Sequence, residues 1–594
     1  MTKKNKDVSN FYLLKGIWKA LKVKRKRQFF LCSLLMIFSG IAETLSIASI
    51  IPFINFLLSP NEIWDNNLTY IIFSKLGFTN IEDPLIGIVC LFTSTIIIAG
   101  FFRIFTLWVI SKFISILATD FSLESFRMSL YQPYSVHISK NSSEVVALNS
   151  VEINQLADVF TYFLRMLLAM TYVFFILIAV FLFDTKLALI SFLIFIFIYF
   201  SLTILSRFYL RRNSIFISNY RQKQIKFLNE GLGSIKEIII DNNHMFYIKN
   251  FFKIDQPLRK KIAENDFISN SPKALVETIA FMYLAFLALY VVMTSSNGIL
   301  LLTKITVIAV SCQKVLPQLQ QIYASWTRIS GNSKAIEKVL YSINQSIPNI
   351  NISHKSKLEF KNQIFLNNIF FKYKDSKKYV LNGINLKIKK SERIGIIGQT
   401  GTGKSTLVDL LIGLLNPSKG NIFVDKIKIS NSKKIDLWRS NIAYIPQDIY
   451  FADSSIIENI ACGLKREDID ITKVIESAKR SQIHDFISKL PLGYETIIGE
   501  MGIKLSGGQR QRLGIARAFF NLYSRKKEIL VLDEATSALD FKIEDLIMRQ
   551  LYELNKNLTI IIISHRYKTL EKCDRIIEIK NGSIISDNKK ISDI

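Results

Sequence analysis

Six long apolar runs constrain the fold of this chain more than any other feature of its sequence. They cover about residues 29–58, 85–116, 160–183, 187–206, 274–296 and 298–323. Each is long enough for the roughly 20 helical residues that cross the hydrocarbon core of a bilayer. The first run is also too long to be the core of a cleavable signal peptide. The pattern therefore predicts an α-helical transmembrane domain with six spans over residues 29–323.

The distribution of basic residues predicts how these spans are oriented. Ten Lys or Arg residues precede the first span and twelve lie in 207–262, whereas the segment 59–84 holds only Lys75. Because Lys and Arg collect on the cytoplasmic side of membrane proteins, residues 1–28 are expected to form a cytoplasmic N-terminal segment. We expect a bacterial inner (cell) membrane protein. Its net charge of +28 is then explained by anionic lipid, with no nucleic-acid partner.

The segments between the spans predict further helices and a second domain. The inner connections, about 117–159 and 207–273, are long and compatible with helices that continue beyond the membrane. Short turns or helices are expected near Ser135–Glu144 and Asn229–Glu237, the second broken at Gly231 and Gly233. Residues 324–357 read as a polar linker. Alternating strand and helix patterns then predict an α/β domain over 358–594.

The α/β part opens with a complete phosphate-binding loop, Gly398-Gln399-Thr400-Gly401-Thr402-Gly403-Lys404-Ser405. A strand pattern precedes it and a helix pattern follows it, which is the context this motif requires. Backbone N–H groups and the helix N-terminus would surround phosphates, Lys404 would reach the β- and γ-phosphates, and Ser405 would hold Mg²⁺. The predicted nucleotide contacts are Gly398, Thr400, Gly401, Gly403, Lys404, Ser405 and Thr406.

Further chemical groups follow the loop in order. Asp533 ends a buried strand pattern and could bind Mg²⁺, and Glu534 beside it could polarise an attacking water. His565 follows another strand and could contact a γ-phosphate, and Gln447 lies in a loop before these strands. The run Ser506, Gly507, Gly508 and Gln509 directly precedes a helix pattern. Its backbone N–H groups predict a second anion site at the N-terminus of that helix.

In this order the motifs resemble those of the ATP-binding cassette family. The resemblance covers the whole length of the chain, because six spans are followed by one P-loop cassette. The resemblance implies ATP and Mg²⁺ as cofactors and ATP hydrolysis coupled to transport. It implies that Tyr373 stacks on adenine and that Gln447 senses both Mg²⁺ and the membrane domain. Asp533 would serve the metal with Ser405 and Gln447. Glu534 would act as the general base, with His565 on the γ-phosphate.

The resemblance also implies a dimer, because the family closes ATP between the phosphate loop of one subunit and the Leu-Ser-Gly-Gly-Gln of the other. A homodimer with two active sites is expected, and a heterodimer stays open. Residues 537–540 resemble the segment that crosses between two cassettes, and 499–502 the stretch that exporters place against their inner loops. The segment 522–528 departs from the family by its length and its lack of proline, and is expected only to lengthen a surface loop.

Three cations in the spans, Arg103, Lys273 and Lys314, are expected to face a substrate cavity and receive an anion, since buried charges are costly. The alternative is that Lys273 reaches an interface and the others pair with acids such as Glu43 or Glu277.

The first span, the aromatic residues of the outer segment 59–84 and the stretch 445–451 resemble PglK-type flippases of lipid-linked oligosaccharides. This implies flipping of a polyprenyl-pyrophosphate glycan across the inner membrane. Export of a peptide, lipid or drug is the alternative, and a membrane-anchored regulator with a cassette is a third reading.

Overall fold

The structure is a computed structural model that describes residues 10–58, 82–183, 185–294, 298–345, 357–374, 376–429, 432–553 and 557–588. It divides into two compact units. The first, called here the helical domain, comprises Met1–Tyr131 and Lys140–Ser346. The second, the α/β domain, comprises Ile347–Ile594 together with Gln132–Ser139, a segment that holds the short helix α7 (Tyr134–Ser139).

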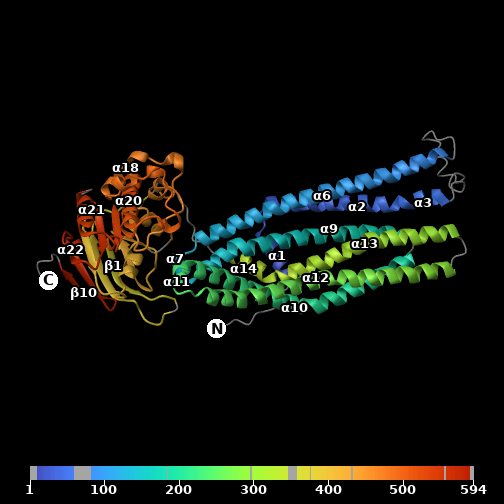
Figure 1. Cartoon of the computed structure of the whole chain (residues 1–594), viewed down its shortest axis with the longest axis horizontal. Helices are drawn as coiled ribbons and strands as arrows, with labels where there is room; N and C mark the ends of the chain where they lie inside the picture. The colour runs from blue at the N-terminus through green and yellow to red at the C-terminus, as the bar shows by residue number, and fades with distance from the viewer. Residues whose placement is uncertain are drawn as a thin grey trace. The chain divides into compact units, whose positions relative to one another are not determined.

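Long helices dominate the helical domain (Figure 1). The longest are α6 (Glu82–Leu130), α10 (Thr185–Gly233) and α12 (His244–Thr294), which have 49, 49 and 51 residues. At 1.5 Å per residue each is about 75 Å long, well beyond a hydrocarbon core of about 30 Å. The helices are therefore as long as predicted, and where they leave the membrane stays a prediction. The remaining helices are α1 (Asn10–Ala20), α2 (Val23–Ala48), α3 (Ile50–Leu58), α8 (Ser142–Ala147), the π-helix η1 (Leu148–Glu152), α9 (Ile153–Phe183), α11 (Ile235–Ile240), α13 (Gly298–Gly331) and α14 (Ser333–Ile343).

The long helices pack side by side, with α9 against α2, α6 and α13, and with α10 against α12. Buried aliphatic side chains such as Met36, Leu164 and Ile329 fill the space between them, while large apolar side chains such as Phe101 and Phe197 face outward. Outward apolar side chains suit contact with lipid. Among the described residues, four helical stretches are long and apolar enough to cross a membrane: Val23–Ile54, Ile86–Leu130, Ser142–Leu182 and Leu193–Gly233.

Each of the six predicted apolar runs is largely helical in the structure, and the count of six membrane crossings remains a prediction. The short helices α7 and α11 lie where inner turns or helices were expected, and α10 ends at Gly233 as the two glycines predicted. Most of the outer segment 59–84 lies outside the described residues, and its role stays untested.

The predicted start of the linker at residue 324 is wrong. Helix α13 continues to Gly331, and α14 carries the chain on to Ile343. Ile336 and Val339 of α14 are fully buried against the helical domain, so the polar residues around them mark only its outer face. Of the expected linker, residues 346–356 lie outside the described part of the chain.

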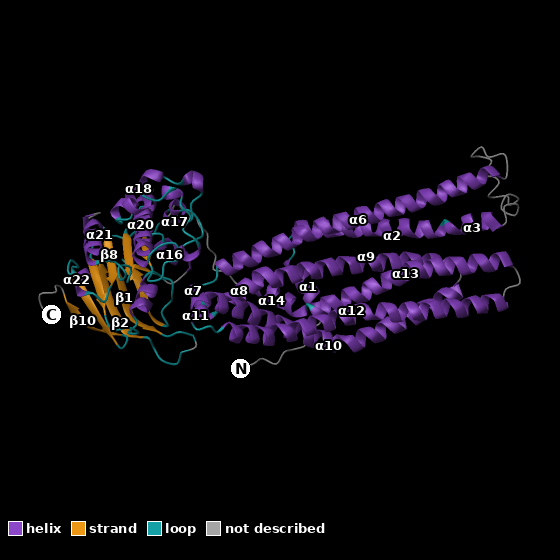
Figure 2. Cartoon of the chain, viewed as in Figure 1, coloured by secondary structure: helices purple, strands orange, loops and turns teal. Residues whose placement is uncertain are grey.

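The α/β domain contains two sheets, drawn in orange in Figure 2. One is antiparallel with strand order β2-β1-β4-β5, and the other has six strands in the order β10-β9-β3-β8-β7-β6. In the second sheet every neighbouring pair is parallel except β10–β9. The strands are β1 (Gln363–Phe371), β2 (Leu381–Lys389), β3 (Arg393–Ile397), β4 (Lys419–Val424), β5 (Ile427–Lys428), β6 (Ile442–Ile445), β7 (Ile529–Asp533), β8 (Thr559–Ile563), β9 (Arg575–Lys580) and β10 (Ser583–Asn588).

Helices flank the sheets and complete two buried clusters of aliphatic side chains. Both β7 and β8 are buried at every residue, which is the pattern of strands covered on both faces. The α-helices are α15 (Lys404–Leu411), α16 (Ser432–Arg439), α17 (Ile456–Ile460), α18 (Ile471–Arg480), α19 (His484–Ser488), α20 (Gly507–Arg525), α21 (Phe541–Glu553) and α22 (Tyr567–Leu570). The 3₁₀ turns are η2 (Arg466–Asp468), η3 (Gly493–Glu495) and η4 (Glu500–Gly502).

The segment 522–528 does not lengthen a surface loop, contrary to the sequence-based expectation. Helix α20 continues through Arg525, and Lys526 ends it in the left-handed conformation. The Lys527 ammonium then turns inward and donates to the backbone carbonyl of Ile442. The extra residues therefore extend a helix and anchor it beside β6.

Candidate functional site

The predicted catalytic groups gather at one edge of the six-stranded sheet. The phosphate loop follows β3, His565 follows β8, Asp533 and Glu534 stand at the end of β7, and Gln447 follows β6. Because these four strands are parallel neighbours, their carboxyl ends lie at the same edge. Ligands of open parallel sheets bind in the crevice outside the carboxyl ends of the strands.

The phosphate loop wraps tightly around the side chain of Lys404. Its ammonium donates to the carbonyls of Gly398 at 2.8 Å and Gln399 at 3.0 Å. Gly403 has φ of 102°, and a Cβ there would lie 2.8 Å from Leu381, so glycine is needed at this turn. The side chain is buried, and this burial lowers the pKa of Lys404. A charged amine held beside backbone N–H groups at the start of α15 is built to receive phosphate.

Asp533 is buried, only 4% exposed, and lacks a full set of partners. Its Oδ2 accepts a hydrogen bond from the Tyr444 hydroxyl at 3.4 Å, while its Oδ1 has no hydrogen-bond partner among the described residues. Burial, and then the neighbouring Glu534, raise the pKa of Asp533, although a hydrogen bond with Ser405 opposes this. A buried carboxylate oxygen without a partner beside the Ser405 hydroxyl fits the oxygen ligands that Mg²⁺ prefers.

Glu534 is the centre of a three-residue cluster. Its Oε2 accepts a hydrogen bond from Gln447 Nε2 at 3.1 Å, and its Oε1 lies 3.0 Å from His565 Nε2. The backbone of Glu534 has φ of 50°, an uncommon conformation for a side chain other than glycine. Strain of this kind persists where the surroundings hold a residue in place, and it clusters at functional sites. The structure thus brings together all three residues predicted to be catalytic.

Tyr373 lies beside the phosphate loop. Its hydroxyl is 3.1 Å from the hydroxyl of Thr406 in α15, and its ring packs edge-on against Phe371 with 5.0 Å between centroids. These contacts fix an aromatic ring next to Thr406, one of the predicted nucleotide contacts. Stacking of Tyr373 on adenine stays a prediction.

Ser506 caps α20 through a reciprocal pair of hydrogen bonds. Its hydroxyl accepts from the backbone N–H of Gln509 at 3.3 Å, and the Gln509 side chain accepts from the backbone N–H of Ser506 at 2.8 Å. At Gly508, a Cβ would lie 3.2 Å from the carbonyl of Ala538, so a side chain there would crowd residues 537–540. Ser506 is exposed and Gln509 is partly buried. Among the described residues, no hydrogen bond or ion pair joins 506–509 to the phosphate loop of the same chain.

Three supporting residues were missed from the sequence. Arg566 donates to Glu544 at 2.8 Å and to the carbonyl of Ser537 at 2.9 Å. Glu544 is buried, and Gln511 accepts a hydrogen bond from the backbone N–H of Ala538 at 2.8 Å. Together they hold residues 537–540, the segment expected to cross between cassettes. The one available signal was that Arg566 directly follows His565.

The three cations predicted to line a substrate cavity differ in their surroundings. Lys314 bonds Glu43 at 2.5 Å, and Lys273 lies 3.9 Å from Glu277. The pairing alternative therefore describes Lys314, whereas Lys273, for which an interface was the alternative, lies near Glu277; a substrate cavity at either lysine stays a prediction. Arg103 is exposed and has no hydrogen bond or ion pair among the described residues.

Comparisons with known proteins indicate the family of the α/β domain. Residues 381–537 match the ABC transporter family. The alpha-hemolysin translocation ATP-binding protein HlyB of Proteus vulgaris is 43% identical over 240 residues, which is 40% of this chain and 33% of that protein. The leukotoxin export ATP-binding protein LtxB of Aggregatibacter actinomycetemcomitans is 39% identical over 272 residues, 46% of this chain and 37% of that protein. The matches thus span about a third of these relatives.

The whole chain is also similar to a solved structure of a bacterial Atm1-family ABC exporter with ATP bound. The TM-score is 0.77 with 20% sequence identity, and the match covers 96% of each chain. The chain therefore has the fold of an ABC exporter, with a helical membrane domain and a cassette. Its α/β domain is an ABC transporter ATPase domain, which binds ATP with Mg²⁺ and hydrolyses it.

Proposed function

We propose that this chain is an ATP-driven exporter of a bacterial inner membrane, with its N-terminus and ATPase domain in the cytoplasm. The observation that carries the proposal is the cluster of Glu534, Gln447 and His565 beside the Lys404 loop. This hydrolytic arrangement is joined to a bundle of apolar helices long enough to cross a membrane. Such a chain has the parts to turn nucleotide hydrolysis into movement of a molecule through the bundle.

Each residue of the cluster has a role that follows from its position. Lys404 exchanges the carbonyls of Gly398 and Gln399 for phosphate oxygens when ATP enters the loop. Asp533 and Ser405 would hold Mg²⁺, which would neutralise charge on the phosphates. Glu534 orients the attacking water and accepts its proton as general base. Gln447 and His565 hold the Glu534 carboxylate in place, and His565 would exchange this contact for one with the γ-phosphate when ATP is bound.

A second copy of the chain completes the site in this proposal. Ser506 and Gln509 offer an accessible helix N-terminus, which attracts anions. They have no described bond to their own phosphate loop, which supports a phosphate from another subunit as their ligand. Because the chain carries both halves of the ATP site, two copies of it can form two complete sites as a homodimer. A heterodimer with a related chain is the alternative.

For the substrate, we favour a peptide, lipid or drug-like molecule over a lipid-linked oligosaccharide. The relatives named above are a hemolysin translocator and a leukotoxin exporter, which supports an exported amphipathic molecule. Flipping of a polyprenyl-pyrophosphate glycan is the second candidate. Arg103, a cation of α6 without a described partner, favours it because a pyrophosphate needs a cation.

Reconstituted liposomes test these proposals. Wild type and Glu534→Gln protein would be compared for ATP-dependent movement of a fluorescent peptide, a fluorescent short-chain lipid and a fluorescent polyprenyl-pyrophosphate oligosaccharide. We expect the wild type alone to move the peptide or the lipid. Movement of the oligosaccharide alone would replace the favoured substrate with the second candidate. Movement of none of them, with ATP hydrolysis intact, would reject export of all three substrate classes.

A further inference from the structure

A polar cavity lies within the helical domain, away from the three cations that the sequence singled out. It has a volume of about 240 Å³ and is lined by residues of α9, α10, α12 and α13 and by Asn332 just after α13. Gln155 on α9 lies 28 residues from Phe183 at the far end of that helix, or about 42 Å along its axis. This exceeds a hydrocarbon core of about 30 Å, so the cavity belongs to the water-facing part of the bundle.

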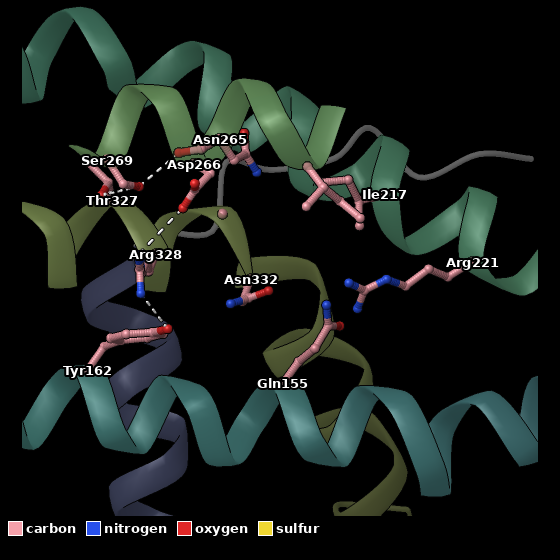
Figure 3. A pocket seen from close by; sticks show the side chains of 12 residues that line it. Gln155, Tyr162, Ile217, Arg221, Asn265, Asp266, Ser269, Thr327, Arg328 and Asn332 are labelled. Carbon is pink, nitrogen blue, oxygen red and sulfur yellow. Dashed lines mark hydrogen bonds and ion pairs between the residues drawn. The ribbon is translucent and has the colours of Figure 1, made fainter. Parts of the chain in front are cut away.

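One wall of the cavity satisfies its own hydrogen bonds. Arg328 donates to the Tyr162 hydroxyl at 2.8 Å and lies 3.5 Å from Asp266, and Thr327 donates to Ser269 at 2.9 Å (Figure 3). The charge of Arg328 is thereby balanced within the wall. These groups shape the cavity but leave little capacity for another charged ligand.

The opposite wall presents polar groups without partners. Arg221, Gln155 and Asn332 have no side-chain hydrogen bond or ion pair among the described residues. Figure 3 shows the Arg221 guanidinium pointing toward the Gln155 amide, with the Asn332 amide in the same space. Gln155 is only 9% exposed and Arg221 is half-buried. These groups are not sealed from solvent, so water satisfies them in the empty cavity, and a ligand that supplies acceptors can take the place of that water.

The nearby acids do not supply them. Glu152 and Asp158 lie within electrostatic reach of Arg221. Glu152 Oε1 accepts hydrogen bonds from Lys338 at 3.1 Å and from Ser218 at 3.0 Å, whereas its buried Oε2 has no hydrogen-bond partner among the described residues, Arg221 included. Asp158 also acts on Arg328, so it offsets the charge of both arginines without a hydrogen bond to either. Arg221 is therefore the cation of this cavity that is left to recognise a ligand.

We propose that the cavity binds a single oxyanion group, a carboxylate or a phosphate monoester, at one end of the transported molecule. The planar Arg221 guanidinium donates two parallel N–H bonds to it, a geometry that a guanidinium offers and an ammonium does not. The amides of Gln155 and Asn332 flank the remaining oxygens. A volume of about 240 Å³ is below the 300–1,000 Å³ of complete ligand pockets, so it takes a terminal group rather than a whole substrate.

This inference rests on the proposed export function and narrows its substrate. One unpaired arginine suits one anionic group better than the multiple charges of a pyrophosphate. It therefore favours a peptide or simple lipid over a lipid-linked oligosaccharide. The carboxylate of a peptide and the phosphate of a lipid share the required chemistry, and the choice of probe separates them.

Equilibrium binding to the purified full chain in phosphatidylcholine nanodiscs tests the proposal. The probes are an acetylated tripeptide with a free C-terminal carboxylate, the same tripeptide as its amide, and short-chain phosphatidic acid. Wild type is compared with Arg221→Gln, Arg221→Lys and Gln155→Glu, and with Arg207→Gln as the matched control. Arg207 is an exposed arginine of the same helix that does not line the cavity.

We expect the free-carboxylate tripeptide or phosphatidic acid to bind wild type and Arg207→Gln with equal affinity. The tripeptide amide should bind neither protein. Arg221→Gln should weaken binding about 10- to 100-fold, the effect of one charged hydrogen-bonding group. Arg221→Lys should recover only part of this loss. Gln155→Glu places a carboxylate beside Arg221 and should also weaken binding, which keeps the test valid if Arg221→Gln fails to fold.

Binding of the tripeptide identifies a carboxylate as the ligand, and binding of phosphatidic acid identifies a lipid phosphate. Equal affinity in wild type, Arg221→Gln and Gln155→Glu would overturn the proposal, as would binding of neither anion to wild type. ATP-driven transport in liposomes is measured separately. If the wild type transports while the cavity variants bind the probes as it does, the inference about the cavity is wrong and the proposed export function is kept. If the wild type transports nothing, the proposed export function itself is wrong.

Discussion

At the scale of single residues, Lys404 and Lys527 are both lysines of the α/β domain whose pKa burial lowers. Lys404 is enclosed by a loop that exposes backbone N–H groups, and the sequence predicted it because the motif is complete. Lys527 donates to the Ile442 carbonyl at the base of β6. Nothing in its sequence neighbourhood indicated burial, since the basic run around it is typical of an exposed loop.

Lys404→Ala should weaken ATP binding about 10- to 100-fold, because it removes a charged donor to the phosphates. Equilibrium binding of a fluorescent ATP analogue to the purified full chain measures this effect. Lys542→Ala, at an exposed lysine of α21, is the control and should bind as wild type does. Unchanged affinity in Lys404→Ala would rule out the assigned role of the loop.

Lys527→Met should stabilise the protein near pH 7 and lose this advantage at high pH. Burial lowers the pKa of Lys527 from 10.5 to about 8. The unfolded chain therefore binds more protons between these values, and wild-type stability rises with pH across that window. At pH 7 the cost of holding the charge is at most about 3 kcal/mol.

Thermal unfolding midpoints of the detergent-solubilised full chain at pH 7 and pH 10 measure the difference. Lys526→Met, at the exposed neighbour, serves as the control. A Lys527→Met midpoint shifted equally at both pH values would show that the ammonium charge is not the cause.

At the scale of elements, the sequence predicted which functional residues follow strands but not the hydrogen bonds that support those residues. Strands β3, β7 and β8 were predicted from apolar runs that end in chemical groups, whereas β6 and the order of the strands in the sheet were not. The hydrogen bonds of Glu544 could not be predicted, since they join α21 to residues beyond both of its ends. The linker was misread because α14 shows polar residues on one face and buries Ile336 and Val339 on the other.

Glu544→Ala should destabilise the α/β domain by about 2 kcal/mol, because it removes the charged hydrogen bond to Arg566, whose side chain is itself 46% exposed. It also removes hydrogen bonds from Thr536 and Thr569, at 2.8 and 2.7 Å. Residues 537–540 should loosen, and the rate of ATP hydrolysis should fall. Thermal unfolding and steady-state ATP hydrolysis of the full chain measure both effects, with Glu553→Ala at the end of α21 as control. An unchanged midpoint would show that this network does not support the fold.

At the scale of the whole molecule, the sequence predicted a membrane domain and a cassette because both depend on local patterns. It could not predict which cations of the helical domain are paired. Lys314 and Glu43 are 271 residues apart in the chain and meet only when α13 packs near α2. Arg221 was counted among the basic residues of a cytoplasmic loop, yet the packing of four helices encloses it in a cavity.

The central claim is that the full chain hydrolyses Mg-ATP with Glu534 as the general base. Steady-state hydrolysis and ATP binding would be measured for wild type, Glu534→Gln and the control Glu467→Gln, which changes an exposed glutamate of η2. The predicted result is that Glu534→Gln keeps ATP affinity but loses about 10²- to 10⁴-fold in turnover, while Glu467→Gln matches wild type. Turnover in Glu534→Gln close to that of wild type would contradict the account.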